Sequence, residues 1–471
     1  MKKYEKVMQE ISSKIWDCAE LKFAEYESSS ALCNVLSAEG FVVKKHLADM
    51  PTAFTATFGS GHPIIGILGE FDALSGLSQQ ADIVEISPIK GKTCGHGCGH
   101  HLLGTAALGA VLAVRDYLQE SGKLGTIIMF GCPGEEGGSG KAYMARAGAF
   151  DKLDVALTWH PAGGNAVMTG SMQANCQAYF RFKGISAHAA SAPHLGRSAL
   201  DAVELMNVGA NYLREHMEAT DRIHYAVLDT GGTSPNVVQG HAESIYLVRS
   251  TDTEKVQKLY ERVCNVARGA AMMTDTNLEI IFDKACSNVL SNSVLEELLH
   301  KSMLAVPLPI YSLAEIEYAQ KFKKTINSQD IGSDLSLIAL DSTAKKLAQA
   351  RYAQLSVADF VLEHEHKDIF ISGSSDVGDT SHVVPTAQFT AACFVPGTPA
   401  HSWQMVAQGK SSIALKGMFY AADVLATATK KIIDDSSFVT AAQAEFKIVT
   451  EGQPYACPIP AEVKPNGLGK K

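Results

Sequence analysis

The sequence predicts an α/β protein in which a mostly parallel sheet is flanked by helices and interrupted by a smaller α+β domain. Three observations support this fold class. Buried strands alternate with helical segments as far as Trp159, the pattern changes near Ser171, and strand character returns near Ile369. Such alternation is typical of parallel sheets, because two parallel strands need a crossover connection, usually a helix. We therefore expect one sheet built from two separated stretches of the chain.

The first stretch opens with helical periodicity. Apolar residues recur every three or four positions over 4–15, and a second helix is expected from about Ser28 to Gly40. Strands are expected next over 41–44, 53–58, 64–68, 126–130 and 155–159. A helix is expected over 102–118, and a short one follows the loop 131–138 and ends at about Ala147. The runs 64–68 and 126–130 are continuously apolar, as in strands buried on both faces.

Residues 172–286 are expected to form a separate, inserted domain. Strands are predicted over 175–182, 223–228, 242–248 and 278–282, and helices over 199–215 and 253–273. This β-α-β-β-α-β order is that of the ferredoxin-like motif. The chain is therefore divided into a discontinuous catalytic domain of 1–171 and 287–450, the inserted domain, and a C-terminal tail of 451–471.

Helix and strand signals continue after the inserted domain. Helices are expected over 295–306, 313–326, 344–354, 411–429 and 437–446, and strands over 369–371 and 389–395. The polar remainder of 327–368 receives no assignment. The two strands predict that the sheet resumes here.

Composition narrows the class of function. The 471-residue chain has a formal net charge of −9 and no basic cluster, which argues against nucleic acid or an anionic membrane as partner. No stretch approaches the roughly 18 to 20 apolar residues of a membrane span. The ten cysteines are scattered, and no apolar signal core follows Lys2 and Lys3. We therefore expect reduced thiols, a cytoplasmic location and a small-molecule substrate.

The stretch Cys94–His101 has the composition of a metal site. It reads Cys-Gly-His-Gly-Cys-Gly-His-His, and thiolate and imidazole bind borderline-soft divalent metals. Its glycines let the backbone bend so that Cys98 and His100 face one centre. The alternatives are a flexible loop, or a Cys94/Cys98 redox pair, although three residues separate these cysteines instead of the two of a redox motif.

Further polar residues follow the predicted strands. Asp72, Glu135-Glu136, His160 and His401 each come just after a strand, and sites in open α/β sheets form outside the carboxyl ends of strands. Taken singly, His160 is explained as well by a hydrogen-bonded structural histidine, and Glu135-Glu136 by a solvated loop. Their convergence on one edge of the sheet carries the prediction of a site.

These residues suit a centre of two divalent metals. The hypothesis is that two ions share one ligand among Cys98, His100, Glu136, His160 and His401. Paired metals polarise a carbonyl and lower the pKa of bound water. Glu135 is then the natural general base, and Asp72 would orient His100 through its second ring nitrogen. A turn or cap role explains Asp72 equally well from spacing alone.

Five motifs give the chain a family resemblance. They are Gly69–Leu74, Gly95–His100, Pro133–Gly140, Gly231–Asn236 and Ser374–Asp379. With them the chain resembles, over about 5–445, the dinuclear metallopeptidase and deacylase family of acetylornithine deacetylase, glutamate carboxypeptidase and the aminoacylases. The match is to its branch with a cysteine ligand, the amidohydrolases of hippurate and of indole-acetyl amino acids.

The resemblance implies roles for residues of the inserted domain. This domain is similar to the family's lid and dimerisation domain, which implies a homodimer. His188 matches a histidine that reaches the partner subunit's site and stabilises the oxyanion. Asn236 and Arg249 match positions that hold the substrate backbone and its terminal carboxylate. Without the resemblance, Arg249 is explained as a surface strand arginine.

The resemblance also implies that the metal ligands and base are those proposed above, with departures. Glu70 stands where the wider family has a metal-binding histidine, and Cys98 where it has a bridging aspartate. His101 follows the motif where an aspartate or asparagine is usual. The roles of His96, His101 and Glu70 stay open, and zinc and manganese both suit the site.

Three functional hypotheses follow. The first is an amidohydrolase that releases an amino acid, glutamate first among candidates, from an N-acyl or aminobenzoyl conjugate. The second is a dipeptidase or an aminoacylase of other acyl specificity, because the sequence does not show pocket shape. The third is a subunit that complements a different catalytic chain in a heteromer. A purely supporting subunit has no chemical need for Glu135, which favours a catalytic chain.

Overall fold

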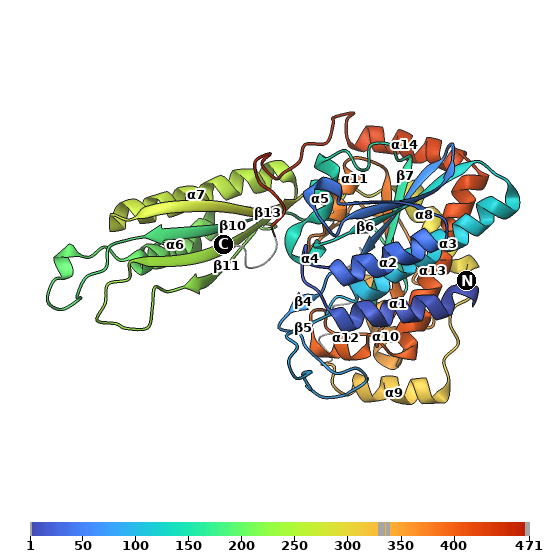
Figure 1. The fold of residues 1–471 in the computed structure, drawn as a ribbon, viewed down its shortest axis with the longest axis horizontal. Coiled ribbons are helices and arrows are strands. Elements are labelled where there is room, and N and C mark those ends of the chain that lie inside the picture. Colours follow the sequence, from blue (N-terminus) through green and yellow to red (C-terminus); the bar gives the residue numbers. More distant parts are fainter. Residues whose placement is uncertain (1, 328–334, 336–339, 467–471) are drawn as a thin grey trace. The chain divides into compact units, whose positions relative to one another are not determined.

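The computed structural model describes residues 2–327, 335 and 340–466, and divides them into two compact units (Figure 1). The first unit comprises 2–171, 289–456 and 465–466. The second comprises 172–288 together with 457–464. Residues 457–464 of the expected C-terminal tail thus group with the second unit, and the last five residues of that tail lie outside the described residues. Each unit is described below by itself.

A seven-stranded sheet forms the centre of the first unit. Its order is β1-β2-β6-β3-β7-β15-β8. The strands are β1 (Val42–Lys45), β2 (Phe54–Ser60), β3 (Ile64–Glu70), β6 (Gly125–Cys132), β7 (Val155–Ala162), β8 (Ala166–Met168) and β15 (Thr386–Ala392). The four central strands are parallel, whereas β1, β2 and β8 pair antiparallel at the two margins. The expected α/β class is confirmed.

The register of the parallel strands brings their carboxyl ends to one edge. Glu70 at the end of β3 pairs with Cys132 at the end of β6, and Ala162 at the end of β7 pairs with Ala392 at the end of β15. Loops that leave these four strands therefore begin side by side, which is where α/β proteins build sites.

Helices cover this sheet and bury its apolar runs. The long ones are α1 (Glu5–Cys18), α2 (Tyr26–Ala38), α3 (His100–Ser121), α8 (Ser293–Ala305), α13 (Ser412–Asp434) and α14 (Ser437–Val449). The helix α3 is buried along nearly its whole length and packs on β3, β6 and β7 and against α13. Because α3 begins at His100, the last two residues of the stretch Cys94–His101 belong to the first turn of this core helix.

Shorter elements complete the first unit. They are α4 (Glu135–Gly138), α5 (Gly140–Arg146), α9 (Leu313–Lys323), α10 (Ser342–Gln354), α11 (Val377–Ser381), α12 (Trp403–Gln408), β4 (Leu74–Ser75), β5 (Cys94–Gly95), β9 (Ser171–Met172) and β14 (Phe370–Ile371). Sequence analysis did not predict β4, β5, β8, β9, α4, α11 or α12. Among the described residues, no helix has the length and apolar character that crossing a bilayer requires.

The second unit is a four-stranded antiparallel sheet with two helices. Along the chain it runs β10 (Ala174–Lys183), α6 (Ala199–Leu213), β11 (Arg222–Asp229), β12 (His241–Ser250), α7 (Thr253–Thr274) and β13 (Asn277–Cys286). The strand order is β11-β12-β10-β13, and both helices pack on the sheet. Burial alternates along β12, so alternate side chains face the helices.

Candidate metal centre

The polar residues predicted to follow strands gather at the carboxyl edge of the first unit's sheet. Asp72 comes two residues after β3, and Glu135 opens α4 just beyond β6. His160 lies inside β7, because that strand continues through Ala162 along β15. The placement differs from the expected position after the strand, but the side chain still reaches the same edge.

Cys98 and His100 enter the site from the loop that leads into α3. Gly99 between them has φ 75°, a left-handed conformation that a residue with a Cβ rarely adopts. This turn places the thiol of Cys98 and the ring of His100 on the same centre. A glycine is therefore needed between Cys98 and His100 because the backbone turns there.

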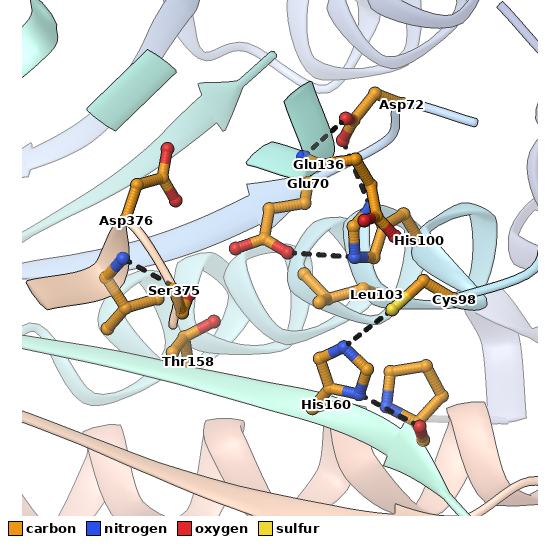
Figure 2. Close-up of polar contacts among 12 residues, drawn as sticks. Glu70, Asp72, Cys98, His100, Leu103, Glu136, Thr158, His160, Ser375 and Asp376 are labelled. Atoms are coloured by element: carbon orange, nitrogen blue, oxygen red, sulfur yellow. Dashed lines mark hydrogen bonds and ion pairs between the residues drawn. The ribbon is translucent and has the colours of Figure 1, made fainter. Parts of the chain in front are cut away.

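Two groups of potential ligand atoms meet at Cys98. Cys98, His100 and His160 form one group, and Cys98, Glu136 and His401 form the other; within each, the ligand atoms lie within 4.8 Å of one another. Cys98 Sγ lies 3.3 Å from His160 Nε2 (Figure 2), and His401 Nε2 lies 3.2 Å from Glu136 Oε1. The described residues thus offer two adjacent metal positions with one shared thiolate.

Asp72 connects the two groups. Its Oδ1 lies 3.0 Å from His100 Nδ1, and its Oδ2 accepts a hydrogen bond from the backbone N–H of Glu136 at 3.0 Å (Figure 2). A neutral His100 that donates its Nδ1 proton to Asp72 keeps a lone pair on Nε2. Asp72 therefore orients one imidazole and one carboxylate-bearing loop at once.

The segment between α1 and α2 makes hydrogen bonds to the loop that carries Glu135 and Glu136. Gly134 has φ 69°, and its N–H donates to Glu25 Oε1 at 2.9 Å. Lys22 Nζ donates to the carbonyl of Gly137 at 2.6 Å. Sequence analysis missed Lys22 and Glu25, because isolated charged residues near a helix end carry no spacing signal.

The ionisable groups of the site shift one another's pKa values. Burial and the Glu136 carboxylate raise the pKa of the Cys98 thiol, but His160 and His100 outweigh them and lower it to about 6. Hydrogen bonds with Cys98 and Glu136 raise the pKa of His401 to about 10. The neighbouring imidazoles thus favour the anionic form of the Cys98 thiol, as a bound cation would.

The pKa of the Glu135 carboxyl is shifted towards the protonated form. Burial, followed by the charges of Glu70, Asp376 and Glu136, raises the pKa of its carboxyl well above the usual range. Burial acts the same way on Glu136, but the hydrogen bond from His401 and the charge of His100 dominate and lower its pKa to about 2. The two adjacent carboxyl groups thus have separate acid-base properties.

The donor set fits two divalent ions. Ligand atoms around one tetrahedral zinc ion lie roughly 3.3 to 3.8 Å apart, given metal–ligand distances of about 2.0 to 2.3 Å. The Cys98–His160 and Glu136–His401 separations are close to this range. Thiolate and imidazole suit zinc, and the carboxylate also suits manganese.

His96 and His101 belong to the same stretch but face elsewhere. His96 Nε2 lies 3.0 Å from the carbonyl of Ile15, and His101 Nε2 lies 2.8 Å from the carbonyl of Gly409. Their rings are buried, with centroids 4.9 Å apart. Both therefore anchor the loop to neighbouring backbone, and neither joins the ligand groups found among the described residues.

Three predicted site residues belong to the second unit. His188 Nδ1 accepts hydrogen bonds from the N–H groups of Ala190 and Ser191, at 3.3 and 3.2 Å. The carbonyl of Asn236 accepts from Ala189 N–H at 2.9 Å, and Arg249 lies on β12. Their roles in substrate binding and oxyanion stabilisation stay predictions.

Comparisons with known proteins show the family of the chain. Residues 66–464 match Peptidase family M20/M25/M40. The chain is 45% identical over 460 residues to a p-aminobenzoyl-glutamate hydrolase subunit of Escherichia coli K12, an alignment that covers 98% of this chain and 96% of that protein. It is 30% identical to human Xaa-Arg dipeptidase, across 57% of this chain and 61% of the relative.

A solved structure has the same fold. The chain matches a dinuclear metal-binding peptidase of Bacillus subtilis with a TM-score of 0.53 at 15% sequence identity, across 91% of this chain and 99% of the other. Identity this low relates the folds alone.

Proposed function

The chain belongs to Peptidase family M20/M25/M40, and from this membership we propose that it hydrolyses the amide bond of an N-acyl amino acid, with p-aminobenzoyl-glutamate as the first candidate substrate. Membership in the family and the named hydrolase relative make it a metal-dependent amidohydrolase or peptidase. The choice of substrate rests on the 45% identity to the hydrolase chain of Escherichia coli.

One observation carries the mechanism, namely the two ligand groups that share Cys98 beside Glu135. We infer that Cys98, His100 and His160 would hold one divalent ion, and that Glu136 and His401 would hold a second together with Cys98. When bound, a pair of zinc or manganese ions supplies the positive charge that polarises a substrate carbonyl and lowers the pKa of water.

Glu135 is proposed as the general base. Its carboxylate would accept a proton from the attacking water and then donate it to the leaving amine nitrogen. Burial and the neighbouring carboxylates raise the pKa of Glu135, which favours the protonated form from which it would donate to the leaving amine. Glu136 next to it, with its lowered pKa, keeps the carboxylate form that a ligand needs.

Residues of the second unit are proposed to bind the substrate. His188 would stabilise the tetrahedral oxyanion in the site of a partner subunit, and Asn236 and Arg249 would hold the substrate backbone and its terminal carboxylate. We propose a cytoplasmic homodimer formed through the second unit. The Escherichia coli relative is named as one subunit of its hydrolase, which supports a heteromer as the alternative assembly.

The test is hydrolysis of p-aminobenzoyl-glutamate by the purified chain with added zinc or manganese, alongside acyl amino acids and an Xaa-Arg dipeptide. Glu135→Gln should abolish turnover while metal content stays at the wild-type value. Glu10→Gln, on the exposed face of α1, is the matched control and should keep full activity. Full activity of Glu135→Gln would remove Glu135 from its role, and cleavage of the dipeptide alone would favour the dipeptidase assignment.

A further inference from the structure

A fully buried lysine lies beside the metal centre. Lys141 is the second residue of α5 and has no exposed surface. Its Nζ donates to Glu70 Oε1 at 2.5 Å and to Asp376 Oδ1 at 2.6 Å, and its backbone N–H donates to Asp376 Oδ2 at 2.9 Å. Lys141 therefore ties together the end of β3, the start of α5 and the residue that precedes α11.

The other oxygen of Glu70 faces a proposed metal ligand. Glu70 Oε2 lies 3.3 Å from His100 Nε2 (Figure 2). Glu70, His100 and Glu135 also form a group whose ligand atoms lie within 4.8 Å of one another. The contacts thus run from Lys141 through Glu70 to His100.

His100 is held between two carboxylates, each with an anchor of its own. Asp72 contacts Nδ1 and is fixed by the N–H of Glu136, whereas Glu70 contacts Nε2 and is fixed by Lys141. A cation bound at Nε2 would also be attracted by the Glu70 charge, provided that this carboxylate keeps its orientation. Partners of this kind orient metal ligands and tune their affinity.

A buried ion pair is by itself weak evidence of a role in stability. A buried ammonium loses its hydration, and apolar residues of similar volume often stabilise a protein as well as a buried ion pair. Arg115 offers a comparison within the same unit, since it is also nearly buried and pairs with two carboxylates, Glu39 and Asp116. Arg115 belongs to no ligand group found among the described residues, whereas the Lys141 contacts reach His100.

We propose that Lys141 is a positioning residue of the metal centre. It holds the Glu70 carboxylate so that Glu70 fixes His100. The negative charge of Glu70 then lies beside the ion that Cys98, His100 and His160 would hold. The proposal rests on the proposed function only in the binding of divalent ions around Cys98. Without the ammonium, Glu70 loses the hydrogen bond that fixes its carboxylate, and the side chain can turn away from His100. That movement takes the negative charge away from His100.

The test is metal affinity of the full chain, measured by competition of zinc with a chromophoric chelator. Lys141→Met should weaken binding of one of two ions by roughly 10- to 100-fold, the range found when such supporting partners are removed. Coulomb's law alone predicts the opposite sign, because loss of a nearby positive charge should tighten cation binding. Unchanged or tighter binding in Lys141→Met would therefore overturn the proposal.

Two further variants separate positioning from a general loss of stability. Arg115→Met should lower the melting temperature but leave zinc affinity at the wild-type value; an equal loss of affinity would overturn the proposal. Glu70→Gln should weaken zinc binding by a similar factor and should add little to Lys141→Met in the double variant. It also keeps Lys141 paired with Asp376, so it carries the test even if Lys141→Met does not fold.

This measurement is independent of substrate. If the wild-type chain binds two ions but cleaves none of the candidate substrates, the proposed function fails and the role of Lys141 can still be decided from zinc affinity. Wild-type affinity in Glu70→Gln would overturn that role even in a fully active hydrolase.

Discussion

Two pairs of residues from the same eight-residue stretch behave differently. Cys98 and His100 face the carboxyl edge of the sheet, where their side chains meet His160, Glu136 and Asp72. His96 and His101 turn the other way and contact backbone carbonyls of α1 and of the residue after α12. The number of histidines in the stretch does not tell which of them are candidate ligands. The group that each imidazole nitrogen contacts separates a candidate ligand from a structural histidine.

The largest effect is expected from the residue that both ligand groups share. Cys98→Ala removes the thiolate from both positions, so the chain should lose both tightly bound ions and all hydrolytic activity. Metal analysis after dialysis against buffer without chelator measures this. Retention of one tight ion in the variant would show that the two positions do not depend on a common ligand.

The next effect separates the two positions. His160→Ala removes a ligand atom from one group only, and His401→Ala from the other, so each variant should retain about one ion per chain. Titration with cobalt(II), followed by its visible absorption, would show different spectra for the two variants, because one retained group contains two imidazoles and the other a carboxylate. Identical spectra would argue against two distinct sites.

A smaller effect is expected at the residue that orients His100. Asp72→Asn keeps the size of the side chain but removes the charge that favours the Nδ1 proton on His100, so zinc affinity should fall by about 10- to 100-fold. Chelator competition measures the change. Wild-type affinity would mean that Asp72 acts only as a turn residue, the alternative that spacing alone left open.

The smallest effect on metal binding is expected at the neighbouring histidine. His101→Leu leaves the carbonyl of Gly409 without its donor, so stability should fall by about 1 to 3 kcal/mol. Denaturant unfolding measures this loss, and the variant should keep its two ions. Loss of a bound ion in His101→Leu would contradict the distinction between ligand and structural histidines in this stretch.

Long, continuous signals made the central part of the fold predictable. The apolar runs 64–68 and 126–130 became β3 and β6, and the 102–118 signal became α3 with only its ends extended. The short helices α11 and α12 were missed, because helices of five or six residues do not complete enough turns to show periodicity. The antiparallel pairing of β1, β2 and β8 depends on how the strands are connected, which a local sequence pattern does not show.

The site was predictable to the extent that its residues follow strands or share a motif. The residues proposed as ligands lie together, because parallel strands deliver them to one edge of the sheet. Lys141 and Glu25 were missed, since their roles arise from contacts across the fold, with Glu70 and Asp376 in one case and Gly134 in the other. Such contacts leave no trace in local spacing.

The most direct test of the metal centre is the number of divalent ions that the purified wild-type chain binds tightly, measured by equilibrium dialysis against zinc and elemental analysis of the protein. The two ligand groups around Cys98 predict two ions per chain. A single ion would contradict the shared-thiolate centre, and a chain that binds none would contradict the metal site as a whole.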